Sequence, residues 1–357
     1  MKNRAFLNVV FLCFLGLALV IARDVATTAS AQQLQVSADL LRAFAPLPAA
    51  FENPDNPLTE AKINLGRMLY YDQRLSIDQD ISCNTCHDLA RYGIDLESPS
   101  AGHRGQFGSR DAPTVYNAAG QVAQFWDGRA RDVEEQAVGP ILNPVEMAMP
   151  NPAYVLKVLK SIPEYVAAFK EAFPGEANPV TYPNIGKAIG AFERKLVTPS
   201  RWDSFLAGGQ NELTDDEKRG LLVFVQAGCA TCHNGALVGG NSFERLGVIK
   251  PWPDSRDLGR FTQTRNEGDR LVFKVPLLRN IEKTGPYFHN GKVKKLAEAV
   301  QLMSTYQVVR ALSEDEIMAV IAWLNTLTGA IPENYISKPR LPPSGPNTPQ
   351  PARGPGD

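Results

Sequence analysis

Cysteine and histidine are scarce in this chain of 357 residues, which contains five cysteines and four histidines. Four of the cysteines and two of the histidines stand in two copies of one short motif, described below. The fifth cysteine, Cys13, lies in an apolar N-terminal stretch that we expect to be removed. We therefore expect no disulfide, although the compartment predicted below would permit one. Only His103 and His289 remain for any other histidine chemistry.

The chain also lacks an excess of charge of either sign. Lysine and arginine number 37 and aspartate and glutamate 38, and the balance beyond residue 31 is 34 to 37. Such a balance excludes the strongly basic surface of a nucleic-acid-binding protein. It predicts soluble partners that dock through local contacts, because no field of one sign is large enough to attract them from a distance.

Strand-like alternation of apolar and polar residues is scarce as well, and helical spacing takes its place. Thr59 is a suitable N-cap for a helix that reaches Tyr71. Capping boxes at Thr214–Glu217 and Ser313–Glu316 predict two more helices, the second ending near Gly329. Further helices are predicted at 152–160, 163–172 and 183–197. The fold class is therefore mainly α, with long irregular loops.

The one long apolar run lies at the N-terminus. Lys2 and Arg4 precede an almost wholly apolar stretch at 5–22, and Ala29-Ser30-Ala31 follows as a cleavage site. These features predict a signal peptide over residues 1–31. An uncleaved membrane anchor stays an alternative, because the apolar run is long.

Two Cys-x-x-Cys-His motifs carry most of the chemical information. They are Cys83-Asn84-Thr85-Cys86-His87 and Cys229-Ala230-Thr231-Cys232-His233. Each cysteine pair can bond the two vinyl groups of a haem, and the adjoining histidine can then reach the iron. Structural zinc would need four ligands in one small loop, and each motif supplies three. A thiol redox site would not require the histidine twice. We predict two covalent haem c groups and, with an export signal, the bacterial periplasm.

One domain for each motif is the simplest organisation. About 300 residues beyond the leader suffice for two domains. We expect two cytochrome c-like haem domains in tandem, at 32–200 and 201–337, with a hinge near 198–202. The segment 338–357 is rich in proline and glycine and is expected to be a disordered tail. The alternative is that it first packs back across the N-terminal domain.

Several segments argue that the chain is more than an electron carrier. The stretch from Ala101 to Met149 is dense in glycine and polar residues, and so are parts of the second half. The informative segments are 102–108, 110–115, 124–130, 134–137, 143–147, 273–276, 278–280 and 286–291. With both haem motifs they recur in order in the bacterial di-haem cytochrome c peroxidases, within the wider family that includes the MauG-like enzymes. The chain closely resembles this family from about residue 50 to residue 330.

The resemblance implies ligands for both haem irons. His87 and His233 match the proximal ligands, and Met303 matches the sixth ligand of the C-terminal haem. A thioether raises the reduction potential relative to a second imidazole. MauG-like enzymes have a tyrosine at that position, so methionine favours the peroxidase branch. His103, among Gly102, Gly105 and Gly108, matches a displaceable ligand of the N-terminal haem. Some family members keep that site open without reduction.

Catalytic residues are implied in the same way. Glu146 matches the family's distal glutamate, which moves a proton between the two oxygens of peroxide, and Gln136 matches the neighbouring amide. Without the family match, Glu146 would be interpreted as a solvated loop residue. Trp126 matches a tryptophan between the two haems, and a packing role at the domain interface is compatible with electron transfer there.

A calcium site between the domains is implied as well. Its ligands are the side chain of Asp111 and the backbone carbonyls of Thr284 and Pro286. The family usually has asparagine at the first of these positions. Aspartate is an equally hard oxygen ligand, so we expect the site to persist. His289 matches a family histidine near the C-terminal haem that is not an iron ligand.

The resemblance implies a periplasmic peroxidase that reduces hydrogen peroxide to water with two electrons. A small c-type cytochrome or a cupredoxin is the expected donor, and a homodimer is the expected assembly. The alternatives are a MauG-like oxidase of a protein substrate, a di-haem electron-transfer cytochrome without catalysis, and a peroxide sensor. An electron-transfer cytochrome would keep both irons six-coordinate, and a sensor would bind peroxide with low turnover.

Overall fold

The computed structural model describes residues 34–352. The predicted leader, its alternative as a membrane anchor and the fate of Cys13 concern residues outside this part of the chain. Between Leu34 and Ala352, no helix combines the length and the apolar character needed to cross a membrane.

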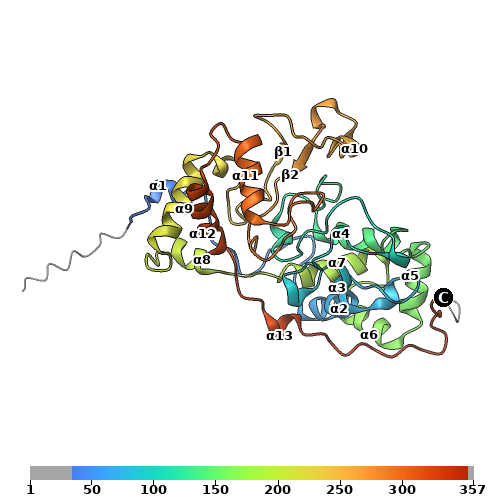
Figure 1. Ribbon diagram of the computed structural model, residues 1–357. Coiled ribbons are helices and arrows are strands. Elements are labelled where there is room, and N and C mark those ends of the chain that lie inside the picture. The colour runs from blue at the N-terminus through green and yellow to red at the C-terminus, as the bar shows by residue number, and fades with distance from the viewer. Residues whose placement is uncertain (1–33, 353–357) are drawn as a thin grey trace, which may run out of the picture. The chain divides into compact units, whose positions relative to one another are not determined.

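Helices dominate the described residues, which confirms the mainly α prediction (Figure 1). The two strands pair in one antiparallel sheet, with Phe243 opposite Lys274 and Arg245 opposite Val272. The α-helices and strands are α1 (Ala38–Leu41), α2 (Glu60–Tyr71), α3 (Cys83–Cys86), α4 (Val133–Leu142), α5 (Pro152–Lys160), α6 (Pro163–Ala172), α7 (Tyr182–Glu193), α8 (Arg201–Leu206), α9 (Asp215–Gln226), β1 (Phe243–Arg245), α10 (Phe261–Thr264), β2 (Val272–Lys274), α11 (Leu296–Tyr306), α12 (Glu314–Asn325) and α13 (Glu333–Ile336). Short 3-10 turns lie at Gln73–Leu75, Leu89–Arg91, His103–Gly105, Ala118–Gly120, Cys229–Thr231 and Glu267–Asp269.

Local capping signals begin the helices where the sequence predicts. Thr59 accepts a hydrogen bond from the backbone of Lys62 at the start of α2. Thr214 with Glu217, and Ser313 with Glu316, form both hydrogen bonds of a capping box. Helix α7 begins one residue before its predicted start and ends at Glu193, four residues before its predicted end.

Two helix pairs build the two largest hydrophobic cores, and they are alike in detail. Helix α2 crosses α7, where a Cβ added to Gly66 would lie 1.9 Å from the carbonyl oxygen of Ala188. Helix α9 crosses α12, where a Cβ added to Gly220 would lie 1.9 Å from the carbonyl oxygen of Ala319. Only glycine permits this approach of two helix backbones. Each pair therefore positions the haem motif that follows its first helix.

The two hydrophobic cores do not divide at residue 200, because each one includes residues from the opposite end of the described chain. Val36 and Phe44, from the beginning, belong to the core built by α9 and α12. Ile336, in α13, belongs to the core built by α2 and α7. Each end of the described chain thus closes the core of the opposite half.

The expected hinge at 198–202 is a fixed junction in the structure. Thr198 is fully buried, and its hydroxyl accepts hydrogen bonds at 2.9 Å from the side chains of Asn117 and Asn280. Asn117 precedes the junction by many residues and Asn280 follows it, so the same hydroxyl binds both halves. Helix α8 begins directly afterwards, at Arg201.

The segment from Lys338 onward was expected to be disordered, with packing against the N-terminal domain as the alternative. Up to Ala352 the structure shows the packing instead of disorder. We call residues 338–352 the C-terminal strap; it runs from α13 along the side of α2 and α6 (Figure 1). Ser161 and Thr348 share a hydrogen bond of 2.7 Å, and Ser344 accepts one of 3.2 Å from Arg74. The composition is that of a disordered tail, but tertiary contacts fix the strap.

Candidate functional site

The first haem motif forms a single turn of helix, α3. His87 follows it, and its backbone N–H donates to the carbonyl of Cys83 at 3.0 Å. The His87 carbonyl accepts a hydrogen bond of 2.7 Å from the Tyr70 hydroxyl of α2. On the ring, Nδ1 lies 3.4 Å from the carbonyl oxygen of Gly93. This contact orients the imidazole and leaves Nε2 as the nitrogen available to a metal.

A cavity of about 1150 Å³ opens beside this motif. It is larger than the roughly 300–1000 Å³ of ordinary small-molecule sites. Two thiols and the imidazole of the motif lie on its wall, together with carboxylates, an amide and an indole from distant segments. Predicted site residues on the wall are Cys83, Cys86, His87, Asp111, Trp126, Gln136, Glu146 and His289. The structure therefore gathers most of the predicted N-terminal haem site around one space.

Glu146 brings a carboxylate to this cavity. Burial raises the pKa of Glu146 above its usual range, against the opposing effects of the Arg129 guanidinium and a hydrogen bond from Asn143. A smaller cavity of about 240 Å³ is also lined by Glu146, Arg129 and Phe125. The guanidinium of Arg129 lies over the Phe125 ring at 3.5 Å from its centre. Glu146 is thus a shielded proton acceptor with a cation nearby.

His103 lies close to Glu146 but does not line the cavity. Its backbone N–H donates to the carbonyl of Glu146 at 2.8 Å, which ties the glycine-rich loop to the glutamate loop. Its imidazole Nδ1 lies 3.4 Å from the carboxylate of Asp78. The structure therefore places the predicted displaceable ligand beside a carboxylate on another segment.

The second motif is held by the α9–α12 core. The His233 backbone donates to the carbonyl of Cys229 at 3.0 Å, and the His233 ring lies 6.3 Å from that of Phe224. Burial lowers the pKa of His233 to about 4, so the imidazole is neutral at pH 7, the form that binds iron. Its Nδ1 is buried without a hydrogen-bond partner in the described structure.

Met303 lies on α11, half-buried against an apolar cluster formed by Leu246, Trp252 and Phe273. Trp126 packs against the same cluster and also lines the large cavity. The Trp126 indole N–H donates to the carbonyl of Asp111 at 2.9 Å, and its ring contacts that of His289 edge to face. His289 in turn stacks on Phe273 at 4.3 Å.

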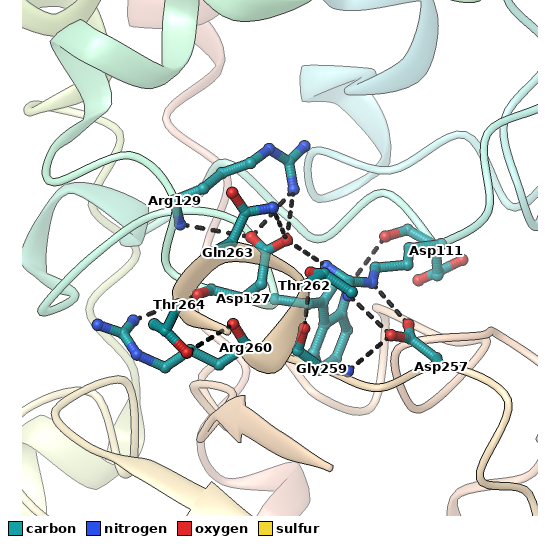
Figure 2. A network of polar contacts seen from close by, with 11 residues as sticks. Asp111, Asp127, Arg129, Asp257, Gly259, Arg260, Thr262, Gln263 and Thr264 are labelled. Carbon is teal, nitrogen blue, oxygen red and sulfur yellow. Dashed lines mark hydrogen bonds and ion pairs between the residues drawn. The ribbon is translucent and has the colours of Figure 1, made fainter. Parts of the chain in front are cut away.

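An ion-pair network joins the two halves next to this aromatic group (Figure 2). The Arg110 guanidinium donates to Asp127 at 2.7 Å and to both carboxylate oxygens of Asp257 at 2.7 and 2.8 Å. Arg129 and Gln263 also donate to Asp127, at 3.0 and 3.2 Å. Burial opposes ionisation of Asp127, but Arg129 and Arg110 hold its pKa below the usual range. The network fixes the segment that carries Trp126.

Asp111, the predicted calcium ligand, is buried, and its backbone N–H donates to the His289 carbonyl at 2.8 Å. Burial raises the pKa of Asp111 to about 7, with a hydrogen bond from Ser98 opposing the shift. Between Leu34 and Ala352, no group of three or more His, Cys, Asp and Glu side chains gathers around a metal position. The predicted site uses one carboxylate and two backbone carbonyls.

The residues at both motifs fit covalently bound haem. None of the four motif cysteines pairs with another cysteine of the described residues, and burial raises the pKa of each thiol. At the first motif the thiols and a correctly oriented imidazole border a cavity large enough for a macrocycle. At the second, the imidazole is buried and neutral. A pair of thiols followed by such a histidine is the donor set of a c-type haem.

Comparisons with known proteins agree with this fit. The family model for "Di-haem cytochrome c peroxidase" matches residues 60–211. The chain is 47% identical over 288 residues to cytochrome c551 peroxidase of Nitrosomonas europaea, covering 80% of this chain and 85% of that protein. It is 43% identical over 316 residues to cytochrome c551 peroxidase of Pseudomonas aeruginosa, covering 87% and 90%. A crystal structure of a MauG-like protein associated with microbial copper homeostasis superimposes with a TM-score of 0.70 at 27% identity, covering 86% of this chain and 97% of that one. The chain belongs to the di-haem cytochrome c peroxidase family.

Sequence reasoning left several residues of the site unassigned. Arg110, Asp127 and Arg129 lie in the segment that it singled out, yet the pairing of Arg110 with Asp257 depends on a loop far along the chain. Glu193, at the end of α7, lines the cavity, and burial raises its pKa to about 8. A glutamate within the apolar stretch that ends α7 was the available signal for a buried acid.

Proposed function

We propose that this protein reduces hydrogen peroxide to water, with two electrons from a small c-type cytochrome or a cupredoxin. Two protons complete the reaction, which forms two molecules of water from one of peroxide. The observation that carries the proposal is the shared cavity, which brings the thiols and imidazole of the first motif together with Glu146 and Gln136. A conductor of electrons alone would need no buried acid at an open site.

The four motif cysteines would hold two haem c groups. Bound there, the haems supply redox-active irons, one open to peroxide and one that stores an electron. We assign His87 and His103 to the N-terminal iron and His233 and Met303 to the C-terminal iron. His103 is the ligand that leaves, and its glycine-rich loop gives the backbone the freedom to move.

Glu146 is the proposed general acid and base. Its carboxylate takes the proton from one peroxide oxygen and returns it to the other, which departs as water. Burial and a raised pKa favour this exchange because they bring the proton affinity closer to that of the reacting oxygens. Gln136 lines the same wall, where its amide can donate to a bound oxygen and fix its position.

Trp126 is the proposed route for electrons between the two halves. Its indole borders the cavity and packs on the cluster that contains Met303. Hydrogen bonds hold it on both sides, since its N–H donates to Asp111 and its carbonyl accepts from the Lys274 backbone at 2.8 Å. A fixed aromatic ring at this place serves packing and electron transfer at once.

Three further assignments belong to the same proposal. Calcium binds the Asp111 carboxylate and the carbonyls of Thr284 and Pro286. The mature chain works in the periplasm as a homodimer. Each half forms a cytochrome c-like haem domain, and the matched crossings at Gly66 and Gly220 support such a duplication.

Redox and kinetic measurements on the purified holoprotein test the function. We expect one-electron reduction to yield a high-spin haem that reacts with peroxide, and steady-state turnover with reduced cytochrome. Two irons that remain six-coordinate at every oxidation level would contradict the proposal. Oxidation of a protein side chain without peroxidase turnover would favour the MauG-like alternative. Two observations argue against that alternative, namely Met303 and the lower identity of the MauG-like structure. Peroxide binding with negligible turnover would favour a sensor.

A further inference from the structure

Asp78 is a buried carboxylate in the turn between α2 and the first haem motif. Its side chain is 0% exposed, and it accepts a hydrogen bond of 3.1 Å from Nε of Arg104. The neighbouring His103 imidazole lies 3.4 Å from the same carboxylate oxygen. A buried carboxylate is costly unless charged and hydrogen-bonding groups face it. His103 and Arg104 are two of the groups that face the Asp78 carboxylate.

The segment around Asp78 is fixed from two sides. The Ile77 N–H donates to the carbonyl of Met147 at 2.9 Å, beside Glu146. The C-terminal strap holds the same segment, because the Ala352 N–H donates to the Ile77 carbonyl at 3.0 Å and Gln79 donates to the Pro349 carbonyl at 2.8 Å. Asp78 is therefore presented from a rigid position.

The loop that carries His103 is built differently. Gly105 and Gly108 have open space where a Cβ would stand, and the Arg104 side chain is 52% exposed. The backbone of Arg104 adopts the left-handed region, with φ of 53°. Gly105 and Gly108 can change their backbone conformation at little steric cost. The contact with Asp78 joins this adaptable loop to the rigid segment.

We propose that Asp78 is a positioning residue that holds the His103 imidazole away from the cavity, by binding Arg104 and accommodating that imidazole. This inference rests on the proposed function, in which His103 is a ligand that leaves the N-terminal iron. The imidazole then has two alternative places, the iron and the Asp78 carboxylate. The balance between them sets how readily the site opens to peroxide.

Two substitutions weaken the Asp78 contact in the holoprotein. Asp78→Asn keeps the shape but removes the charge, and Arg104→Gln removes the guanidinium from a half-exposed side chain. In the one-electron-reduced protein, we expect each to raise the ratio of low-spin to high-spin N-terminal haem by about tenfold, as loss of a charge-assisted hydrogen bond implies. Electron paramagnetic resonance and optical spectra measure this ratio. Arg42→Gln, which removes an exposed arginine paired with Asp39, is the matched control and should leave it unchanged.

Failure of the inference and failure of the proposed function are distinguishable. If His103→Gly abolishes the low-spin signal while Asp78→Asn and Arg104→Gln leave the ratio at the parent value, His103 is a ligand and Asp78 does not hold it. If His103→Gly retains the parent low-spin signal, His103 is not a ligand and the inference falls, whereas the proposed function falls only if the parent protein shows no turnover with peroxide. A shift in Arg104→Gln alone, with a poorly folded Asp78→Asn, still supports the proposal.

Discussion

Glu146 illustrates how a loop carboxylate becomes a reactive group. It lies beside proline and asparagine in a segment that would be solvated in isolation, but the packing of α4 and the His103 loop encloses it. A Cβ on Gly102 would lie 2.0 Å from the Val145 carbonyl, so the two loops are in direct backbone contact. The raised pKa of Glu146 results from that enclosure, and Arg129 limits the shift.

Replacing Glu146 with glutamine tests its role as proton carrier. Glutamine has the same size but cannot accept and return a proton, so we expect turnover with peroxide to fall about 10²–10⁴-fold. The optical spectra of both haems should be retained, because Glu146 is not a ligand. Stopped-flow mixing with peroxide and steady-state assays measure the loss. Turnover equal to that of the parent would exclude Glu146 from the mechanism.

At this scale the sequence predicts the residues that belong to continuous motifs. The haem cysteines, His87 and His233 are fixed by five-residue patterns, and Glu146 and Gln136 by resemblance. Asp78 and Asp257 were not predicted, because their partners are brought to them by the folded chain. His103 next to Asp78 is likewise a contact that no local spacing implies.

Helices form where the sequence contains strong capping signals. The N-caps of α2, α9 and α12 each satisfy the first free N–H groups of their helix, and the sequence showed all three. The C-terminal strap shows the opposite behaviour. Proline-rich composition predicts disorder, yet Thr348 is only 5% exposed and Gly345 touches the Ser161 carbonyl. Tertiary packing decides where local preference is weak.

Gly345→Ala tests how firmly the strap is held. The new methyl would lie 2.4 Å from the Ser161 carbonyl oxygen, so the strap must lift. Overpacking of this kind costs about 1–3 kcal/mol, and we expect the melting midpoint to fall by roughly 2–8 °C. Trypsin should also cleave faster after the exposed Arg340. Gly175→Ala, with open space around the added methyl, is the matched control. A Gly345→Ala protein as stable and as resistant as this control would show that the strap adapts.

Each half of the molecule contributes side chains to the hydrophobic core of the other half. Phe44 from the start of the described chain packs on Trp202 and Trp323, and Tyr335 near its end stacks on Phe192. Arg110 and Thr198 add polar links between the halves. Two tandem domains were a reasonable expectation from two motifs, but exchanged ends leave no trace in composition or spacing.

Calcium removal tests one of these links. The buried Asp111 carboxylate has a pKa raised to about 7, and a bound cation would favour its ionised form. At a calcium concentration 100 times the dissociation constant we expect about 2.7 kcal/mol of added stability, which a chelator removes. The melting midpoint of the holoprotein, followed against calcium concentration, measures it. Asp111→Asn should retain the dependence and Asp111→Ala should lose it, whereas a calcium-independent parent would exclude the site.

The strap also sets an order of assembly. Ribosomes make residues 338–352 after both haem motifs, yet these residues brace the turn just before Cys83. The half of the protein that leaves the ribosome first is therefore the half whose fold is completed last. Until residues 349–352 dock, the turn before Cys83 lacks the hydrogen bonds that join Ala352 to Ile77 and Gln79 to Pro349.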